Sequence, residues 1–272
     1  MRTDVSTPGF AGRLALVVLV LAMAAVAWLQ PLEDAANEQV DAGLKRALLG
    51  FATARALNAA ISLAQGTEIA VQPAGVGINL TVGQVLDPLN DLVERFSDLM
   101  LTASIAFGIQ KVLLEIGAHW AISAGLSLLA AVWAAAFLGR GRAPPWLSRM
   151  LLILLLARFA VPLAAIGSDA AFRHFMADDY VVSQQAIEGA AGGAARLGPP
   201  PATEPAGLIE RFKGWLEAQG GEWKARFEQL RQTVEQATDH IVRLMVIFIL
   251  QTLVFPLLLL WGLLAAGRGL LR

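Results

Sequence analysis

One arginine stands inside a long apolar run and is the residue best placed in this sequence to do chemistry. Arg158 lies within residues 150–167, MLLILLLARFAVPLAAIG, which carry no other charge. A charge inside a membrane-crossing helix is costly, so it marks a functional candidate that binds an anion or pairs with an acid. The alternative is structural: the guanidinium group reaches the lipid headgroups or binds backbone carbonyls freed by Pro162 or Pro256. The other apolar runs offer no acid in their middles as a partner.

Gln251 is the second polar residue inside an apolar run, and two prolines accompany these polar residues. Gln251 lies within residues 241–266, as does Pro256, and Pro162 follows Arg158 by four positions. Proline is expected to kink each helix, and transporters use such broken helices, although proline is also common in ordinary membrane helices. A channel or transporter component lined by Arg158 and Gln251 is therefore one functional hypothesis.

Histidines beside carboxylates form the weakest group of candidates. Glu115 and His119 stand four residues apart and share one face of a helix, and His174 has aspartates nearby in the sequence. Imidazole and carboxylate together ligate metals, but no HExxH or comparable motif is present. The sequence also lacks cysteine, a G-x-S-x-G nucleophile motif and a phosphate-binding glycine loop. We therefore predict no metal, no cofactor and no catalytic residue. The third functional hypothesis is a membrane enzyme that acts on lipid, with Glu115, His119 and His174 as its candidate residues.

The apolar runs themselves indicate an integral membrane protein. Hydrophobic residues make up 56% of the 272 positions and charged residues only 16%, whereas soluble domains carry about 25% charged residues. A helix needs about 20 apolar residues to cross about 30 Å of hydrocarbon. Residues 117–139, 150–167 and 241–266 meet this requirement. Residues 14–29 are fewer, and we expect an uncleaved anchor there, with a cleaved signal peptide ending near Ala27 as the alternative.

The arginines orient these four spans, because positive residues near span ends remain in the cytoplasm. Two arginines precede the first span, three occupy the loop 140–149 and two follow the last span, and only one of the 22 acidic residues shares these places. The sequence therefore predicts a bacterial inner-membrane protein with both termini in the cytoplasm. The predicted order is a cytoplasmic tail (1–13), an anchor or signal peptide (14–29), a periplasmic region (30–116), a span (117–139), a cytoplasmic loop (140–149), a span (150–167), a periplasmic region (168–240), a span (241–266) and a cytoplasmic tail (267–272).

Each periplasmic region contains a helix with apolar residues at alternating intervals of four and three, which is the pattern of coiled-coil packing. The first seam is Val40, Leu44, Ala47, Phe51, Ala54, Asn58 and Ile61, and the second is Trp223, Phe227, Leu230, Val234, Ala237 and Ile241. The first helix is expected to end at Gly66, before an alternating pattern over residues 69–82 that predicts a β-hairpin. Residues 189–205 read as a Gly/Pro-rich linker, followed by an amphipathic helix over residues 206–240.

These patterns predict an all-α integral membrane protein with a helical hairpin and a small β-hairpin outside the membrane. Catalytic constellations are missing, while two packing seams and an exposed strand edge are predicted. The function that best fits is a non-enzymatic scaffold, assembly or interaction protein. Its expected partners are the lipid bilayer, further copies of the chain and other membrane or periplasmic proteins. A net charge of −1 argues against binding nucleic acid.

Overall fold

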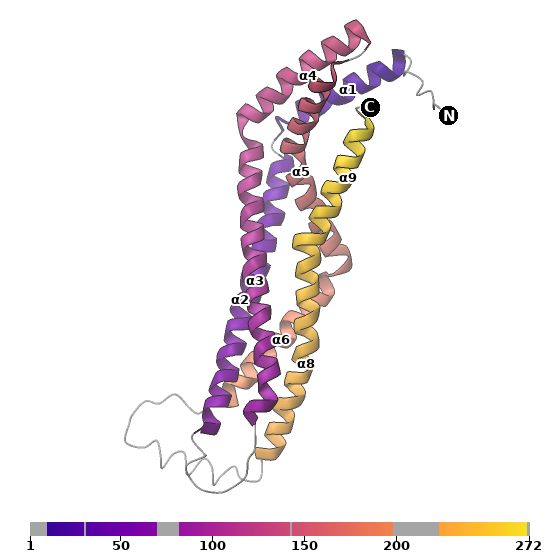
Figure 1. Ribbon diagram of the computed structural model, residues 1–272. Helices are drawn as coiled ribbons and strands as arrows, with labels where there is room; N and C mark the ends of the chain where they lie inside the picture. Colours follow the sequence, from indigo (N-terminus) through magenta and orange to yellow (C-terminus); the bar gives the residue numbers. More distant parts are fainter. Residues whose placement is uncertain (1–9, 30, 70–81, 142, 198–222, 271–272) are drawn as a thin grey trace, which may run out of the picture. The chain divides into compact units, whose positions relative to one another are not determined.

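All regular structure in the described part of the chain is helical (Figure 1). The computed structural model describes residues 10–29, 31–69, 82–141, 143–197 and 223–270. The elements are α1 (Phe10–Val26), α2 (Pro31–Ile69), α3 (Val82–Ala118), α4 (Trp120–Arg140), α5 (Pro145–Phe175), α6 (Ala177–Leu197), α8 (Trp223–Ile249), the π-helix η2 (Leu250–Val254) and α9 (Phe255–Leu270). The prediction of an all-helical membrane-type chain is confirmed at this level.

Four helical stretches are long and apolar enough to cross a membrane, judged by length and composition. They are Pro88–Ala118, Trp120–Arg140, Pro145–Phe175 and Gln236–Gly267. The last two contain the predicted spans 150–167 and 241–266. The second, Trp120–Arg140, covers the predicted span 117–139 from residue 120 onward, because the helix is interrupted at His119. The first lies in α3, within the region 30–116 that the sequence analysis placed in the periplasm. Helices α1 and α2 pass the same test only as a pair, bent by 61°.

The predicted β-hairpin is not found. The described residues contain no strand, and the two ends of the predicted hairpin, Ile69 and Val82, lie in α2 and α3. The remaining hairpin residues, 70–81, lie outside the described residues. Gly66 does not end its helix either, because α2 continues three residues beyond it. A glycine near a helix end lowers helix stability by about 1 kcal/mol, which a long helix tolerates.

Helix α6 also occupies part of the predicted linker. It continues to Leu197 through a stretch rich in alanine, the residue with the highest helix propensity. The rest of the predicted linker, residues 198–205, lies outside the described residues, as does the first part of the predicted helix 206–240. That helix is described from Trp223 onward as α8.

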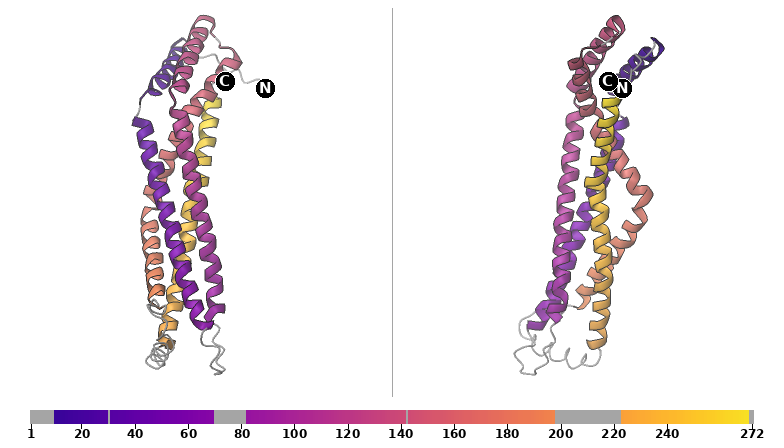
Figure 2. Two further views of the ribbon diagram at one scale, coloured as in Figure 1. Left: turned by 90° about the vertical axis from the view of Figure 1, so that its left-hand side faces the viewer. Right: turned by 45° about the vertical axis from the view of Figure 1, so that its right-hand side comes forward.

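The chain divides into two compact units, each a bundle of helices. Unit 1 comprises residues 1–44, 105–172 and 250–272, and unit 2 comprises residues 45–104 and 173–249. In unit 1, α1 and α4 lie side by side in every view of Figures 1 and 2. Their contact forms an apolar core with the first half of α5. This core includes Val17, Val20, Ala24, Leu126, Ala130, Trp133, Leu147 and Leu151.

Unit 2 is built from α6, α8 and the adjoining parts of α2 and α3, and its densest contact joins α6 to α8. On α8 the buried positions Ala237, Ile241, Leu244 and Phe248 follow one another at intervals of four, three and four. The first two belong to the second predicted seam, and the other two continue it along α8. Its earlier members lie within α8, but their side chains are outside the described residues; they are Trp223, Phe227, Leu230 and Val234.

The seam of α2 uses smaller residues than the sequence pattern suggested. The buried positions are Ala36, Val40, Gly43, Ala47, Gly50, Ala54, Leu57 and Ile61, again at alternating intervals of four and three. Val40 and Ile61 lie in this seam as expected, while Leu44 and Phe51 lie one position away and are half-buried. The two glycines take their places because bulky residues of α3 fill the space: Phe107 lies against Gly43 and Met100 against Gly50.

We predict opposite effects for alanine at two glycines of neighbouring helices. A Cβ atom at Gly43 would lie 2.4 Å from the buried ring of Phe107, so Gly43→Ala should destabilise the protein by about 1–3 kcal/mol. A Cβ atom at Gly108 on α3 would meet nothing within 4 Å, so Gly108→Ala should gain about 0.5–1 kcal/mol from helix propensity alone. Thermal unfolding in detergent, followed by tryptophan fluorescence, measures both. Equal shifts for the two variants would contradict this packing.

Candidate functional site

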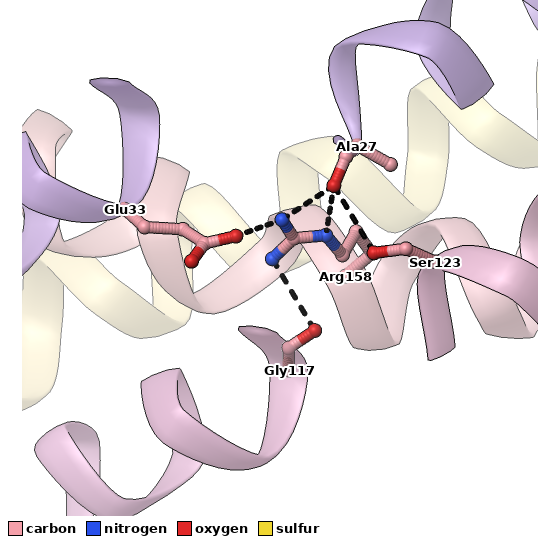
Figure 3. A network of polar contacts seen from close by, with 5 residues as sticks. All are labelled: Ala27, Glu33, Gly117, Ser123 and Arg158. Carbon is pink, nitrogen blue, oxygen red and sulfur yellow. Dashed lines mark hydrogen bonds and ion pairs between the residues drawn. The ribbon is translucent and has the colours of Figure 1, made fainter. Parts of the chain in front are cut away.

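Arg158 lies inside unit 1, and all the groups it binds belong to the protein (Figure 3). Its side chain is only 4% exposed. Nε and Nη2 donate to the carbonyl oxygen of Ala27 at 3.1 and 2.6 Å, and Nη1 donates to the carbonyl oxygen of Gly117 at 3.2 Å. Nη2 also forms an ion pair with Oε1 of Glu33. Each of the three guanidinium nitrogens therefore has an acceptor.

Arg158 finds two free carbonyl oxygens because helices α1 and α3 both end beside its side chain. Ala27 follows the last residue of α1, and Gly117 is the second-last residue of α3. The last carbonyls of a helix have no intrahelical donor and carry the negative end of the helix dipole. A buried guanidinium group between two such ends satisfies the carbonyls and is attracted by both dipoles. Figure 3 shows the side chain of Arg158 entering this gap.

The ion-pair partner is Glu33, in the first turn of α2. An acid is favourable at this end of a helix, because the free N–H groups and the dipole carry partial positive charge there. The sequence analysis searched for a partner within the spans and found none. Glu33 comes from the acidic stretch immediately after the first apolar run, so a search extended by one helical turn past the predicted span would have found it.

Two serines of α4 complete the network around Ala27. Ser123 Oγ donates to the carbonyl oxygen of Ala27 at 3.0 Å, which gives that oxygen three donors. One turn later, Ser127 Oγ donates to the carbonyl of Ser123 and accepts from Trp28 Nε1 at 2.9 Å. We call Ala27, Glu33, Gly117, Ser123 and Arg158 the Arg158 joint. It connects α1, α2, α3, α4 and α5 at the breaks between α1 and α2 and between α3 and α4.

Close packing of the backbone keeps the joint compact. A Cβ atom on Gly117 would lie 3.0 Å from the carbonyl oxygen of Ala157, tighter than most such contacts. The glycine thus lets the end of α3 approach α5. Pro162 stands in the interior of α5, where its missing N–H leaves the carbonyl oxygen of Arg158 without the usual helical donor. Neither feature opens space for a ligand.

A second buried polar contact lies further along α5. Asp169 is buried, and the side-chain amide of Gln39, with its nitrogen directed toward the acid, donates to Oδ2 at 2.6 Å and Oδ1 at 3.2 Å. Gln39 lies on α2, six residues after Glu33. Helices α2 and α5 therefore exchange polar contacts at two successive levels of unit 1. The sequence analysis placed this aspartate only beside His174 and did not anticipate its burial.

Gln251 is buried in the π-helix η2, and it is not joined to Arg158 by any contact in the described part of the chain. The wider turn at this place has a local cause. Pro256 has no N–H to give to the carbonyl of Thr252, and its ring crowds that carbonyl, so the helix widens just before it. The Oε1 atom of Gln251 finds no donor among the described residues.

Glu115 and His119 lie at the break between α3 and α4. They line an open depression of about 440 Å³ together with Val112, Ile116 and Ile122. His119 precedes α4 and its Nδ1 accepts the backbone N–H of Ala121 at 3.3 Å, so one ring nitrogen caps the helix. No group of three metal-binding side chains occurs in the regions that the structure describes.

The remaining histidines have local partners in unit 2. His174, at the end of α5, is exposed and packs edge-on against the ring of Phe175. His240 on α8 lies 3.2 Å from the hydroxyl of Ser183 on α6. Between α6 and α2, the buried amide of Gln184 donates to Thr53 Oγ1 and to Glu188 Oε1, both at 2.9 Å. These contacts connect neighbouring helices of unit 2.

Comparison with models of protein families, with curated proteins and with solved structures found no match to this chain.

We predict that Arg158→Met destabilises the protein by roughly 3–5 kcal/mol, because it leaves the partly buried carboxylate of Glu33 unpaired, the Gly117 carbonyl without its side-chain donor and the Ala27 carbonyl with the Ser123 hydroxyl alone. Glu33→Gln in the same chain should restore part of this loss, because it removes the unpaired charge. Arg149→Met serves as the control, since Arg149 is exposed on the same helix. Thermal unfolding in detergent measures all three. If Arg158→Met melts like the control, the joint does not hold the helices together.

Tyr180 provides a pH-dependent reporter for unit 2, because it is the single tyrosine of the sequence. Burial raises the pKa of its hydroxyl, an effect that the charge of Arg46 opposes and that of Glu188 supports. The folded protein should therefore keep this phenol neutral above the ordinary value near 10. In the unfolded chain this tyrosine ionises at its ordinary pKa near 10. The contribution of the neutral phenol to folding stability is therefore complete below pH 10, and it is lost as the pH rises through the higher pKa of the folded protein. Alkaline titrations of the native and the denatured protein, followed by tyrosinate absorbance, test this. The native curve should lie at higher pH, and two superimposable curves would contradict the prediction.

Proposed function

We propose that this protein is a non-enzymatic membrane scaffold that holds partner proteins, or further copies of itself, through the helices of unit 2. The observation that carries this proposal is the state of Arg158. A substrate-binding arginine needs free donors facing a cavity, but each guanidinium nitrogen here is engaged by the protein itself. This buried charge connects helices of unit 1, as a structural role requires.

The exposed apolar side chains of unit 2 support an interaction role. Phe175, Val181 and Val182 are among its exposed large hydrophobic residues, and they lie where α5 ends and α6 begins. All three belong to the region 168–240, predicted to lie outside the membrane, and Phe175 is also the last residue of the candidate span Pro145–Phe175. Exposed apolar residues gathered outside a bilayer are typical of protein-binding surfaces. Asp178 and Asp179, also exposed, flank them and add a polar rim.

The proposed setting is the inner membrane of a bacterium, with both termini in the cytoplasm and unit 2 on the periplasmic side. Its support is the distribution of arginines along the sequence. The exposed tryptophans add to it: Trp28, Trp120, Trp146 and Trp261 lie near ends of the apolar stretches, where aromatic residues anchor helices at the interface.

A photo-crosslinking residue placed at Val182 should give discrete protein adducts in living cells, while the same residue at the exposed, polar Arg55 of unit 2 should not. Val182→Asp should abolish co-purification of the adduct partner and leave the melting temperature unchanged, because the side chain is exposed. Equal adducts at the two positions would remove the support for a specific surface. Solute flux in proteoliposomes that Arg158→Met abolishes, with the protein still folded, would replace the scaffold with a transporter.

A further inference from the structure

Helix α3 has two opposite apolar faces in unit 1, and only one of them is covered by protein. Phe107 and Leu114 point into the bundle, whereas Ile105, Ile109, Val112 and Ile116 expose 56, 56, 54 and 55% of their surfaces. The exposed four recur at intervals of four, three and four and so form a continuous stripe along one side of the helix. We propose that this α3 stripe lies against the hydrocarbon of the bilayer, while the neighbouring helix α2 faces water at the same depth.

The two helices are in register, so their outer faces can be compared level by level. Lys111 of α3 pairs with Asp41 of α2 at 2.7 Å, and Phe107 of α3 fills the place beside Gly43 of α2. These contacts place residues 34–43 of α2 beside the α3 stripe, because the two helices run in opposite directions. The outer face of α2 there exposes Asp34 and Glu38.

The carboxylates of α2 require water. A charged side chain in the middle of a bilayer costs at least about 2.5–3.5 kcal/mol on insertion scales. Asp34 and Glu38 have one turn between them, so two such costs would fall on a single face. At this level of unit 1, lipid can therefore contact α3 but not the acidic side of α2.

Lipid is the occupant that the surroundings of the α3 stripe favour. The helix that carries it is itself long and apolar enough to cross a membrane, and so is α4, which follows after the single residue His119. Helix α4 also exposes apolar residues, including Trp120, Leu128 and Val132. The depression at the α3–α4 break is lined by Val112, Ile116 and Ile122 together with the polar Glu115 and His119, so the apolar stripe meets polar side chains there.

At this level of unit 1, the α3 side consequently faces lipid and the α2 side faces water. Asp34 follows Glu33 directly in the sequence, and Glu33 is paired with Arg158 and 20% exposed. Water on the α2 side thus comes within one helical turn of the joint.

Single cysteines test both sides, because the sequence contains no cysteine. The full chain carrying Ile109→Cys or Glu38→Cys, labelled with bimane, is placed in nanodiscs of phosphatidylcholine and phosphatidylglycerol. Brominated phosphatidylcholine should quench bimane at position 109 several-fold more than at position 38. A charged maleimide should modify the unlabelled Glu38→Cys protein much faster than the Ile109→Cys protein.

Three outcomes would overturn the proposal. Quenching at position 109 by aqueous iodide and not by brominated lipid would place the α3 stripe in water. A disulfide between two copies at position 109, without lipid quenching, would show that a second copy covers the stripe. Strong lipid quenching at both positions would place the acidic side of α2 in the bilayer. Melting temperatures of the two variants, compared with the unmodified chain, show that each is folded.

Discussion

The structure of unit 1 depends on one requirement: helix ends inside an apolar layer must find donors for their free carbonyls. Two helices end close together, α1 at Val26 and α3 at Ala118. In water those ends would be solvated, but in hydrocarbon each unsatisfied carbonyl costs several kcal/mol. Arg158 and Ser123 supply the donors, and Glu33 balances the charge. The two breaks in the chain are therefore stable only where they meet α5.

The small residues of α2 are the second constraint, because they allow the backbones of α2 and α3 to come close together. Glycine at positions 43 and 50 lets rings and thioethers of α3 enter the surface of α2. Helices that approach this closely gain dispersion contacts along their whole length, which is the main attraction available between helices once apolar surroundings remove the hydrophobic effect. The close approach also brings Lys111 within reach of Asp41 and keeps α3 in register with α2.

Several features could be predicted from the sequence because each depends on local composition. The runs 150–167 and 241–266 lie in helical stretches that are long and apolar enough to cross a membrane, and so do residues 120–139 of the run 117–139, since about 20 apolar residues are what such a helix needs. The α2 seam could be read in part: Val40, Ala47, Ala54 and Ile61 are buried, but the positions between them are Gly43, Gly50 and Leu57. Leu44 and Phe51 are the larger neighbours of Gly43 and Gly50, so a search for bulky apolar residues selects them. Only the side chains on α3 decide which position faces inward.

The Arg158 joint could not be predicted from the sequence, because its acceptors are also supplied by other helices. Arg158 could be singled out, and backbone carbonyls were among its expected acceptors, because a guanidinium group in an apolar run must bind something. The prolines at 162 and 256 were considered as the source of those carbonyls, yet the acceptors are helix ends at Ala27 and Gly117, which are 131 and 41 residues away along the chain. Of the alternating pattern at 69–82, only the two end residues are described, and both belong to helices, Ile69 to α2 and Val82 to α3.

The partial exposure of Glu33 explains how a buried ion pair is tolerated in this place. Removing two charges from water costs several kcal/mol per ion, and an isolated pair rarely recovers it. Here Arg158 is almost wholly buried, but it gains two carbonyl acceptors and two helix dipoles in addition to the carboxylate. Glu33 keeps part of its surface open and lies at the positive end of α2. The desolvation cost therefore falls mainly on Arg158, the partner with the most compensating contacts, so a network of protein groups can hold this charge in a buried place.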